Sequence, residues 1–263
     1  MSVEPNYTLQ TQDLSIGYFL KTGKHIVAGD LNFSLKKGEL VGLVGSNGIG
    51  KSTLLRTLCK VQKPIAGAIT INETPLDTYS FESLAETLSV VLTEVPASKN
   101  MTVGELVALG RQPYTNWLGT LTESDKTHIL QALEATEMLP LKNRKCYELS
   151  DGQLQRALIA RALAQDTPII ILDEPTTHLD IYHRASILKL LKNLTATTGK
   201  TILFSTHEID LAIQLCDQMI VMTPEKTYFG DPCALIEAGH FSQLFPKNLI
   251  DFDGATGSFR IVR

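Results

Sequence analysis

The chain has 263 residues, of which 43% are hydrophobic and 20% are charged, and its net charge is −4. A chain of this length can bury a substantial core, and its composition is that of an ordinary soluble protein. The slightly acidic balance gives no general reason to bind nucleic acid or an anionic membrane.

Membrane-spanning and disulfide-stapled proteins are also disfavoured. The longest apolar runs, such as residues 168–172, have the length of a strand and fall far short of the ~18–20 residues that a membrane-spanning helix needs. Residues 1–10 contain no basic region followed by an apolar one, so we expect no secretion signal and a cytoplasmic protein. The four cysteines form no Cys-x-x-Cys pair, which argues against a zinc site or a disulfide framework.

Apolar segments alternate with helical patterns along the chain, which is typical of a parallel sheet covered by helices on both faces. The apolar segments are residues 39–44, 88–92, 168–172, 201–205 and 218–222. The helical patterns are residues 51–60, 123–138, 152–164, 182–195 and 208–216. We therefore expect an α/β core.

Two further regions depart from this alternation. Residues 7–37 and 66–72 read as short alternating strands, which predict a small antiparallel piece. Residues 95–165 are almost wholly helical in pattern and predict an inserted helical subdomain. We expect one domain over residues 1–263. Its expected parts are an antiparallel β part with a glycine-rich loop in 7–72, the helical subdomain in 95–165, the rest of the core in 166–225 and a tail in 226–263.

The stretch "GSNGIGKST", residues 45–53, matches the phosphate-binding loop pattern Gly-x-x-x-x-Gly-Lys-Ser between a strand and a helix. Glycines let the backbone curl with positive φ and bring its N–H groups to phosphate oxygens. Lys51 would place a charge on the β- and γ-phosphates, and Ser52 a hydroxyl on Mg²⁺. A glycine-rich turn that binds nothing is the alternative, which the strand-helix context disfavours. The residues expected to bind ATP here are Gly45, Ser46, Asn47, Gly48, Ile49, Gly50, Lys51, Ser52 and Thr53.

A second stretch, "IIILDEP" at residues 169–175, places two acids at the end of an apolar strand. Ligands of doubly wound sheets bind at this end of the strands. Asp173 would hold Mg²⁺ through water, and Glu174 would polarise the attacking water as general base. Two adjacent acids alone are also typical of a polar turn, but together with the phosphate loop they indicate a P-loop NTPase with a RecA-like core.

Three more stretches narrow the class: "LSDGQLQRALIARAL" at 149–163, "PTTHLD" at 175–180 and "STHEIDLA" at 205–212. They resemble the signature motif, the D-loop and the switch histidine of the ATP-binding-cassette (ABC) ATPases, in an order and spacing that cover residues 14–225. "LSIGYF" at 14–19 resembles the aromatic loop of that family. The resemblance implies that Tyr18 stacks on adenine, and a buried core tyrosine is the alternative.

Ser150 is a good N-cap, and the helix that it begins offers N–H groups to an anion. The phosphates of a nucleotide bound to the same chain are already surrounded by residues 45–53. This helix start must therefore contact a nucleotide that is bound to a second chain. The family resemblance implies the same, a head-to-tail homodimer with two sandwiched ATP molecules. Each ATP would meet Ser150, Gly152 and Gln153 of the other subunit, with His207 at the γ-phosphate and Asp180 lining the interface. An ordinary helix cap and a core histidine are the alternatives.

The chain departs from the family pattern in two places. Asp151 replaces a glycine of the signature tetrad, and its carboxylate would repel a γ-phosphate if it pointed inward, so we expect it to point outward. A gapless count places Thr93, with Glu94 beside it, where relatives carry a glutamine that contacts Mg²⁺. Either oxygen-bearing side chain could reach a metal.

The segment 101–138, with its "GRQPY" at 110–114, looks like the ABC subfamily that powers uptake of ferric siderophores, haem and cobalamin. This likeness implies an ATPase on the cytoplasmic side of the inner membrane that serves a separate permease and, indirectly, an extracytoplasmic substrate-binding protein. Tyr114 and Trp117 predict a dock for a permease helix, with core packing as the alternative. An ABC exporter, a soluble ABC ATPase acting on ribosomes or DNA, and a P-loop kinase remain the rival functions, and we expect no nucleic-acid partner.

Overall fold

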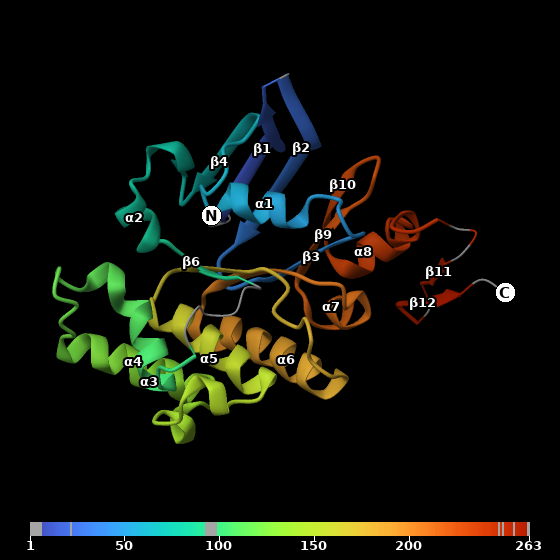
Figure 1. Cartoon of the computed structure of the whole chain (residues 1–263). Coiled ribbons are helices and arrows are strands. Elements are labelled where there is room, and N and C mark those ends of the chain that lie inside the picture. Colours follow the sequence, from blue (N-terminus) through green and yellow to red (C-terminus); the bar gives the residue numbers. More distant parts are fainter. Residues whose placement is uncertain are drawn as a thin grey trace, which may run out of the picture. The chain divides into compact units, whose positions relative to one another are not determined.

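The computed structural model describes residues 7–21, 23–92, 99–246, 248, 250–254 and 256–261 (Figure 1). The chain forms two compact units, residues 1–78 with 201–263 and residues 79–200. Both units contain strands and helices, as expected for an α/β protein. None of the helices in the described ranges has the length and apolar character needed to span a membrane.

The first unit contains the antiparallel sheet that the sequence predicts, with strand order β2-β1-β4-β5. Inward-facing apolar residues such as Leu9, Leu14 and Ile16 are fully buried, and this burial sets the register of β1 against its neighbours. Leu9 lies opposite Ile71 in β4. The strands are β1 (Tyr7–Leu20), β2 (Gly23–Lys36), β4 (Ala66–Ile71) and β5 (Thr74–Pro75).

The same unit contains the central strand β3 (Leu40–Gly45), every residue of which is buried. β8 (Thr201–Ser205) and β9 (Gln218–Met222) pair with β3 in parallel on its two sides, and β10 (Thr227–Gly230) is antiparallel to β9. Helix α1 (Lys51–Leu58) follows β3, and α7 (Ile209–Leu215) follows β8. Because β3 and β8 are parallel, the loops that follow them leave the sheet at the same edge.

The C-terminal tail, which the sequence left undetermined, folds into short elements in this unit: α8 (Pro232–Glu237), the 3₁₀ turn η5 (Phe241–Gln243), and the hairpin β11 (Ile250–Asp253) and β12 (Ser258–Ile261). Its core is aromatic: the Phe252 ring centroid lies 5.2 Å from that of Phe241 and 4.9 Å from that of Phe259. Both α8 and β12 contact α7 (Figure 1).

The second unit is mainly helical, and α5 contacts α3, α4 and α6 (Figure 1). Strands β6 and β7 pair in parallel, with Val91 opposite Leu172. Thr102 and Thr122 begin their helices with reciprocal capping boxes, which satisfy N–H groups of the first turn. The elements are α2 (Phe81–Ala85), β6 (Leu88–Val91), α3 (Val103–Ala108), η2 (Leu109–Tyr114), α4 (Glu123–Ala135), η3 (Leu139–Leu141), η4 (Cys146–Glu148), α5 (Asp151–Ala164), β7 (Ile169–Leu172) and α6 (Ile181–Thr198).

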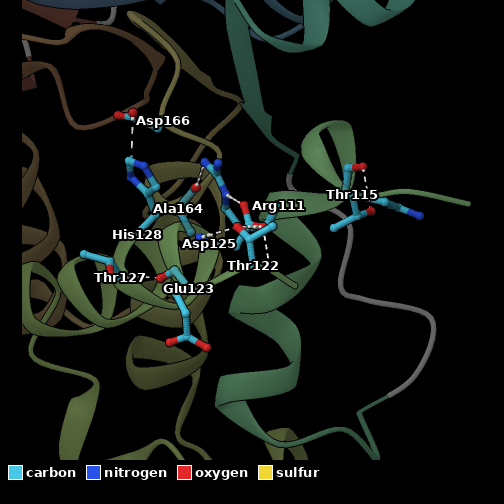
Figure 2. A network of polar contacts seen from close by, with 10 residues as sticks. Arg111, Thr115, Thr122, Glu123, Asp125, Thr127, His128, Ala164 and Asp166 are labelled. Carbon is cyan, nitrogen blue, oxygen red and sulfur yellow. Dashed lines mark hydrogen bonds and ion pairs between the residues drawn. The ribbon is translucent and has the colours of Figure 1, made fainter. Parts of the chain in front are cut away.

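A buried ion pair holds the helices of this unit together. Arg111 Nε lies 2.8 Å from Asp125 Oδ1, and the two residues are only 5% and 2% exposed. Arg111 Nη1 also donates to the carbonyl of Ala164, 2.9 Å away, so η2 is joined to α4 and to the end of α5 (Figure 2). Hydrogen bonds from the Thr122 hydroxyl and backbone N–H, and then from Arg111, lower the pKa of Asp125 to about 2.

We expect Arg111→Ala to lower the free energy of unfolding by about 3–5 kcal/mol, because it leaves the Asp125 carboxylate buried without its counter-ion. Denaturant unfolding at neutral pH measures this. Lys126→Ala is the matched control: Lys126 pairs with Glu123 at 2.7 Å on the surface, so the loss should stay within about 0.5 kcal/mol. Equal losses of unfolding free energy in the two variants would contradict the large stabilisation that we expect from the buried pair.

The pKa of Asp125 is lower in the folded state than the ordinary 3.8. The stabilisation that ionised Asp125 gives to the folded state is therefore present at higher pH and is lost as the pH falls. The shift corresponds to about 2 kcal/mol. The free energy of unfolding of Asp125→Asn should therefore differ most from that of the wild type above about pH 4, and the difference should shrink toward pH 2. A pH-independent difference in unfolding free energy would contradict this reading.

Candidate functional site

The loop of residues 45–50 connects β3 to α1, and its glycines are required by its shape. Gly48 and Gly50 have φ of 77° and 114°, a left-handed conformation that side chains rarely adopt. A Cβ on Gly45 would lie 2.8 Å from the carbonyl oxygen of Met222, and a Cβ on Gly50 would lie 2.6 Å from Val27 Cγ1. The loop therefore curls closely against the neighbouring strands, as the phosphate-loop pattern predicts.

Helix α1 begins at this loop without a side-chain cap. Its N-cap is Gly50, and the first turn contains no acidic residue. The first helical hydrogen bond runs from the Leu54 N–H to the Gly50 carbonyl, at 2.8 Å. The positive end of the helix dipole is thus presented at the loop, where an anion is stabilised.

Lys51 folds back over the loop that precedes it. Its Nζ donates to the carbonyl oxygens of Gly45 and Ser46, at 2.9 and 3.2 Å, and the residue is only 6% exposed. A buried ammonium is strongly stabilised by an anion that replaces weaker carbonyl partners. The loop and the lysine together therefore form a cradle suited to phosphate.

Tyr18 on β1 lies beside this cradle. Its hydroxyl is 3.1 Å from Thr53 Oγ1, on the first turn of α1, and the residue is 43% exposed. The alternative of a buried core tyrosine is therefore wrong, and the ring is accessible to a stacking partner. Adenine stacking by Tyr18 stays a prediction.

His207 follows β8 at the same edge of the sheet as the phosphate loop. The preceding Thr206 N–H donates to the Leu43 carbonyl of β3, 3.1 Å away, and the Thr206 hydroxyl accepts from the Glu208 N–H at 3.0 Å. His207 itself is exposed, so it is not a core histidine. The first unit thus contains Tyr18 and Lys51 at the phosphate loop and α1, and His207 in the loop after the neighbouring strand β8.

In the second unit, Asp173 and Glu174 directly follow β7. The Asp173 N–H donates to the Val91 carbonyl of β6 at 2.9 Å, so the acids emerge at the carboxyl edge of this parallel pair. Glu174 has φ of 48°, a strained conformation for a residue with a side chain, and such strain is concentrated at functional positions. Thr177 Oγ1 donates to Glu174 Oε2 at 3.1 Å and orients the carboxylate. Thr93 and Glu94 lie outside the described residues.

Ser150 caps α5, as the sequence predicts. Its Oγ accepts from the Gln153 N–H at 3.3 Å, and Gln153 Oε1 accepts from the Ser150 N–H at 3.1 Å. Gln153 therefore supports the helix start through its side chain. Asp151 is exposed at the first helical position, and the outward direction of its carboxylate stays a prediction, whereas Gly152 is buried.

Asp180 caps α6 in a similar way, since its Oδ1 accepts from the His183 N–H at 2.8 Å. Sequence reasoning missed two residues in this unit: Arg111, which anchors η2, and His183, which contacts both Asp180 and Gly152. An Asp-x-x-His spacing at a helix start was a usable signal for the first of these His183 contacts. The second contact depends on tertiary packing.

Residues 28–177 match the family model described as ABC transporter. The chain belongs to the ABC transporter family. Members of this family hydrolyse ATP, so this ABC protein is an ATPase with ATP as its substrate.

Curated relatives of the ABC protein are named as import ATP-binding proteins. It is 38% identical over 220 residues to the petrobactin import ATP-binding protein FpuD of Bacillus anthracis, covering 84% of this chain and 79% of the relative. It is 39% identical over 215 residues to the iron(3+)-hydroxamate import ATP-binding protein FhuC of Bacillus subtilis, covering 82% and 78%. The cobalamin import ATP-binding protein BtuD of Halobacterium salinarum is 31% identical over 237 residues, covering 89% of this chain and 59% of the relative.

Solved structures confirm the P-loop NTPase fold of the ABC protein. One is cbiO1 from Clostridium perfringens, part of the ABC transporter complex cbiONQ, with a TM-score of 0.78, 29% identity, and coverage of 90% of this chain and 93% of that chain. Another is the dimeric ATP-binding cassette MJ0796 in a post-hydrolysis state with ADP and Pi, with a TM-score of 0.71, 27% identity, and coverage of 85% and 98%.

We expect Lys51→Ala to weaken ATP binding about tenfold to a hundredfold, since it removes a charge-assisted hydrogen bond from the phosphate cradle. Equilibrium binding of ATP to the purified chain measures this. Lys63→Ala, which changes an exposed lysine of the same unit, is the control and should bind ATP like the wild type. An unchanged affinity in Lys51→Ala would remove the loop from the nucleotide site.

Proposed function

We propose that this ABC protein is the ATP-hydrolysing subunit of an importer that takes up an iron complex, a siderophore or haem, through a separate membrane permease. The cradle of residues 45–53 around Lys51 supports nucleotide binding. Iron-complex import is supported by the likeness to FpuD and FhuC, at 38% and 39% identity over more than four fifths of this chain.

The working form that we propose is a head-to-tail homodimer. The phosphates of a bound ATP are surrounded by residues 45–53 of one subunit, and Ser150, Gly152 and Gln153 of the second subunit close over the γ-phosphate. Asp180 lines the shared interface. The exposed, serine-capped start of α5 supports this assignment, as does the dimeric state of the similar cassette bound to ADP and Pi.

Within this proposal Glu174 is the general base. It takes a proton from water, the water oxygen bonds to the γ-phosphorus, and the bond to the bridging oxygen breaks so that ADP leaves. Lys51 offsets charge on the transferred group, and His207 contacts the γ-phosphate. The carboxylate of Glu174 is oriented by Thr177, and Tyr18 stacks on adenine.

The oxygen donors of the site suit Mg²⁺, which prefers carboxylate and hydroxyl ligands. We propose that the Ser52 hydroxyl and, through water, the Asp173 carboxylate hold the ion, with Thr93 or Glu94 as a further oxygen donor. When bound, the ion draws negative charge from the β- and γ-phosphate oxygens.

A groove on the second unit is an observation in favour of a permease partner. It has a volume of 520 Å³ and is lined by residues of α2, β6 and η2 and by residues in and just after the end of α5. At its rim Phe81 is 76% exposed and Leu109 is 46% exposed, and exposed apolar groups rimmed by polar ones mark interaction sites. We propose that a cytoplasmic helix of the permease binds here. The lining residues are Phe81, Glu82, Ala85, Val90, Leu109, Gly110, Gln112, Pro113, Arg161 and Gln165.

The proposed location is therefore the cytoplasmic face of the inner membrane, with an extracytoplasmic substrate-binding protein as an indirect partner. Cobalamin is a second candidate cargo, because BtuD is 31% identical to the chain over 89% of its length. Neither cargo touches the proposed ATPase residues, so the cargo is identified by transport assays.

We expect Glu174→Gln to retain ATP binding while hydrolysis falls by about 10²–10⁴-fold, since the amide cannot accept the proton from water. Steady-state ATPase assays and ATP-dependent dimerisation of the purified chain measure this. Glu134→Gln, at an exposed position of α4, is the matched control. Undiminished hydrolysis in Glu174→Gln would rule out Glu174 as the base.

The same two variants identify the cargo in cells that carry one copy of the gene. Glu174→Gln should abolish uptake of radioactive iron given as a siderophore or as haem, while uptake of cobalamin remains. Loss of cobalamin uptake alone would favour the second candidate.

We expect Phe81→Ala to reduce transport by about tenfold while the ATPase rate of the isolated chain stays unchanged, because truncating an aromatic anchor of an interface typically costs 1 kcal/mol or more. Leu130→Ala removes an apolar group that is 41% exposed on α4, away from the groove, and should transport normally. Co-purification with the permease gives the direct readout, and an unchanged complex in Phe81→Ala would contradict docking at this groove.

A further inference from the structure

His183, in the first turn of α6, contacts the residue that caps this helix. Its Nδ1 lies 2.9 Å from both carboxylate oxygens of Asp180, and its backbone N–H donates to Asp180 Oδ1 at 2.8 Å. The backbone hydrogen bond and then the imidazole hydrogen bond lower the pKa of Asp180. The carboxylate therefore stays ionised, and it contacts one edge of the imidazole.

The other edge of the imidazole lies against the start of α5. A Cβ on Gly152 would be 2.6 Å from His183 Cδ2, 3.2 Å from Cγ and 3.4 Å from Nε2. Gly152 is buried and belongs to the Ser-x-Gly-Gln segment that begins at Ser150. The ring thus fills the space that any side chain at position 152 would need.

One turn further along, α5 and α6 are joined without His183. Arg156 Nη2 donates to Ser186 Oγ at 2.8 Å, and Arg156 Nη1 donates to the Thr136 carbonyl at 3.1 Å. The first contact joins α5 to α6, and the second joins α5 to the end of α4. The contacts of His183 therefore act at the two helix starts, where Ser150 and Asp180 are the N-caps.

We infer that His183 is a positioning residue that joins Asp180 to the Ser150–Gln153 segment, so that both present themselves to the second copy of the chain in one fixed arrangement. This inference rests on the proposed ATP-bound homodimer. The ring transmits a displacement of either helix start to the other, and with the ring in place the two helix starts close on ATP together.

Two variants separate the two contacts. His183→Phe keeps a ring against Gly152 and loses the hydrogen bond to Asp180, whereas His183→Asn keeps a donor near the position of Nδ1 and loses most of the ring. Each is placed in a Glu174→Gln chain, and the ATP concentration for half-maximal dimerisation is measured by sedimentation. We expect each to raise this concentration about tenfold, typical of one coupled contact, while ADP binding to the single chain and the melting temperature change little.

A suppressor test examines the contact with Gly152 directly. Gly152→Ala brings a Cβ into the ring, so it should impair dimerisation more than His183→Ala does. The double variant Gly152→Ala/His183→Ala has room for the methyl group and should dimerise like His183→Ala alone. A double variant as impaired as Gly152→Ala would show that the methyl group does not act through the His183 ring, and would overturn the inference.

The remaining outcomes are distinct. If the Glu174→Gln parent dimerises with ATP and both His183 variants match it, the inference is wrong and the proposed dimer stands. If ADP binding and thermal stability fall in step with dimerisation, His183 is merely structural and the inference is again wrong. A parent that binds ATP and stays monomeric would refute the proposed dimer, and the role of His183 with it.

Discussion

Backbone N–H groups at the start of a helix attract an anion or an acceptor side chain. Three helices of this chain differ in how these groups are capped. Helix α1 begins at Gly50 with no side-chain cap, so a phosphate can supply the missing acceptors. Helix α5 begins at Ser150, whose neutral hydroxyl satisfies one N–H, and its first turn contains one acidic residue, Asp151. Helix α6 begins at Asp180, whose carboxylate already supplies the negative charge. In the proposed dimer the start of α1 binds the phosphates of the ATP held by the same chain, and the start of α5 binds those of the ATP held by the partner. The start of α6 lines the interface.

The second unit holds α5 in place along its whole length. His183 meets Gly152 at the start of the helix, Arg156 meets Ser186 in the middle, and Arg111 binds the Ala164 carbonyl at the end. The last contact is the least exposed of the three, because Arg111 and its partner Asp125 are almost fully buried. A buried pair of this kind is costly to break, and it specifies one arrangement of the surrounding elements. The groove that we propose for the permease is lined by Gly110 and Gln112, which flank Arg111 in the sequence. The groove and the end of α5 are therefore stabilised by the same buried ion pair.

Glu174, the general base that we propose, shows a different kind of constraint. Glu174 adopts a left-handed backbone conformation directly after β7, and Thr177 binds its carboxylate. Such a conformation persists only where the surrounding structure enforces it. The strand, the turn and the hydroxyl together leave this carboxylate little freedom, which is the condition for a general base that must meet a water molecule in one geometry.

The sequence by itself determined the phosphate loop, the acids after an apolar strand, the N-cap at Ser150 and the alternation of strands and helices. These features are local: glycine spacing, capping residues and apolar periodicity act within a few residues of the backbone. The tertiary structure alone decided that Tyr18 and His207 are exposed, that Arg111 pairs with Asp125 inside the helical unit, and that His183 fills the space beside Gly152. These contacts join residues that are far apart along the chain, and only the packing of helices and strands sets the distances between them.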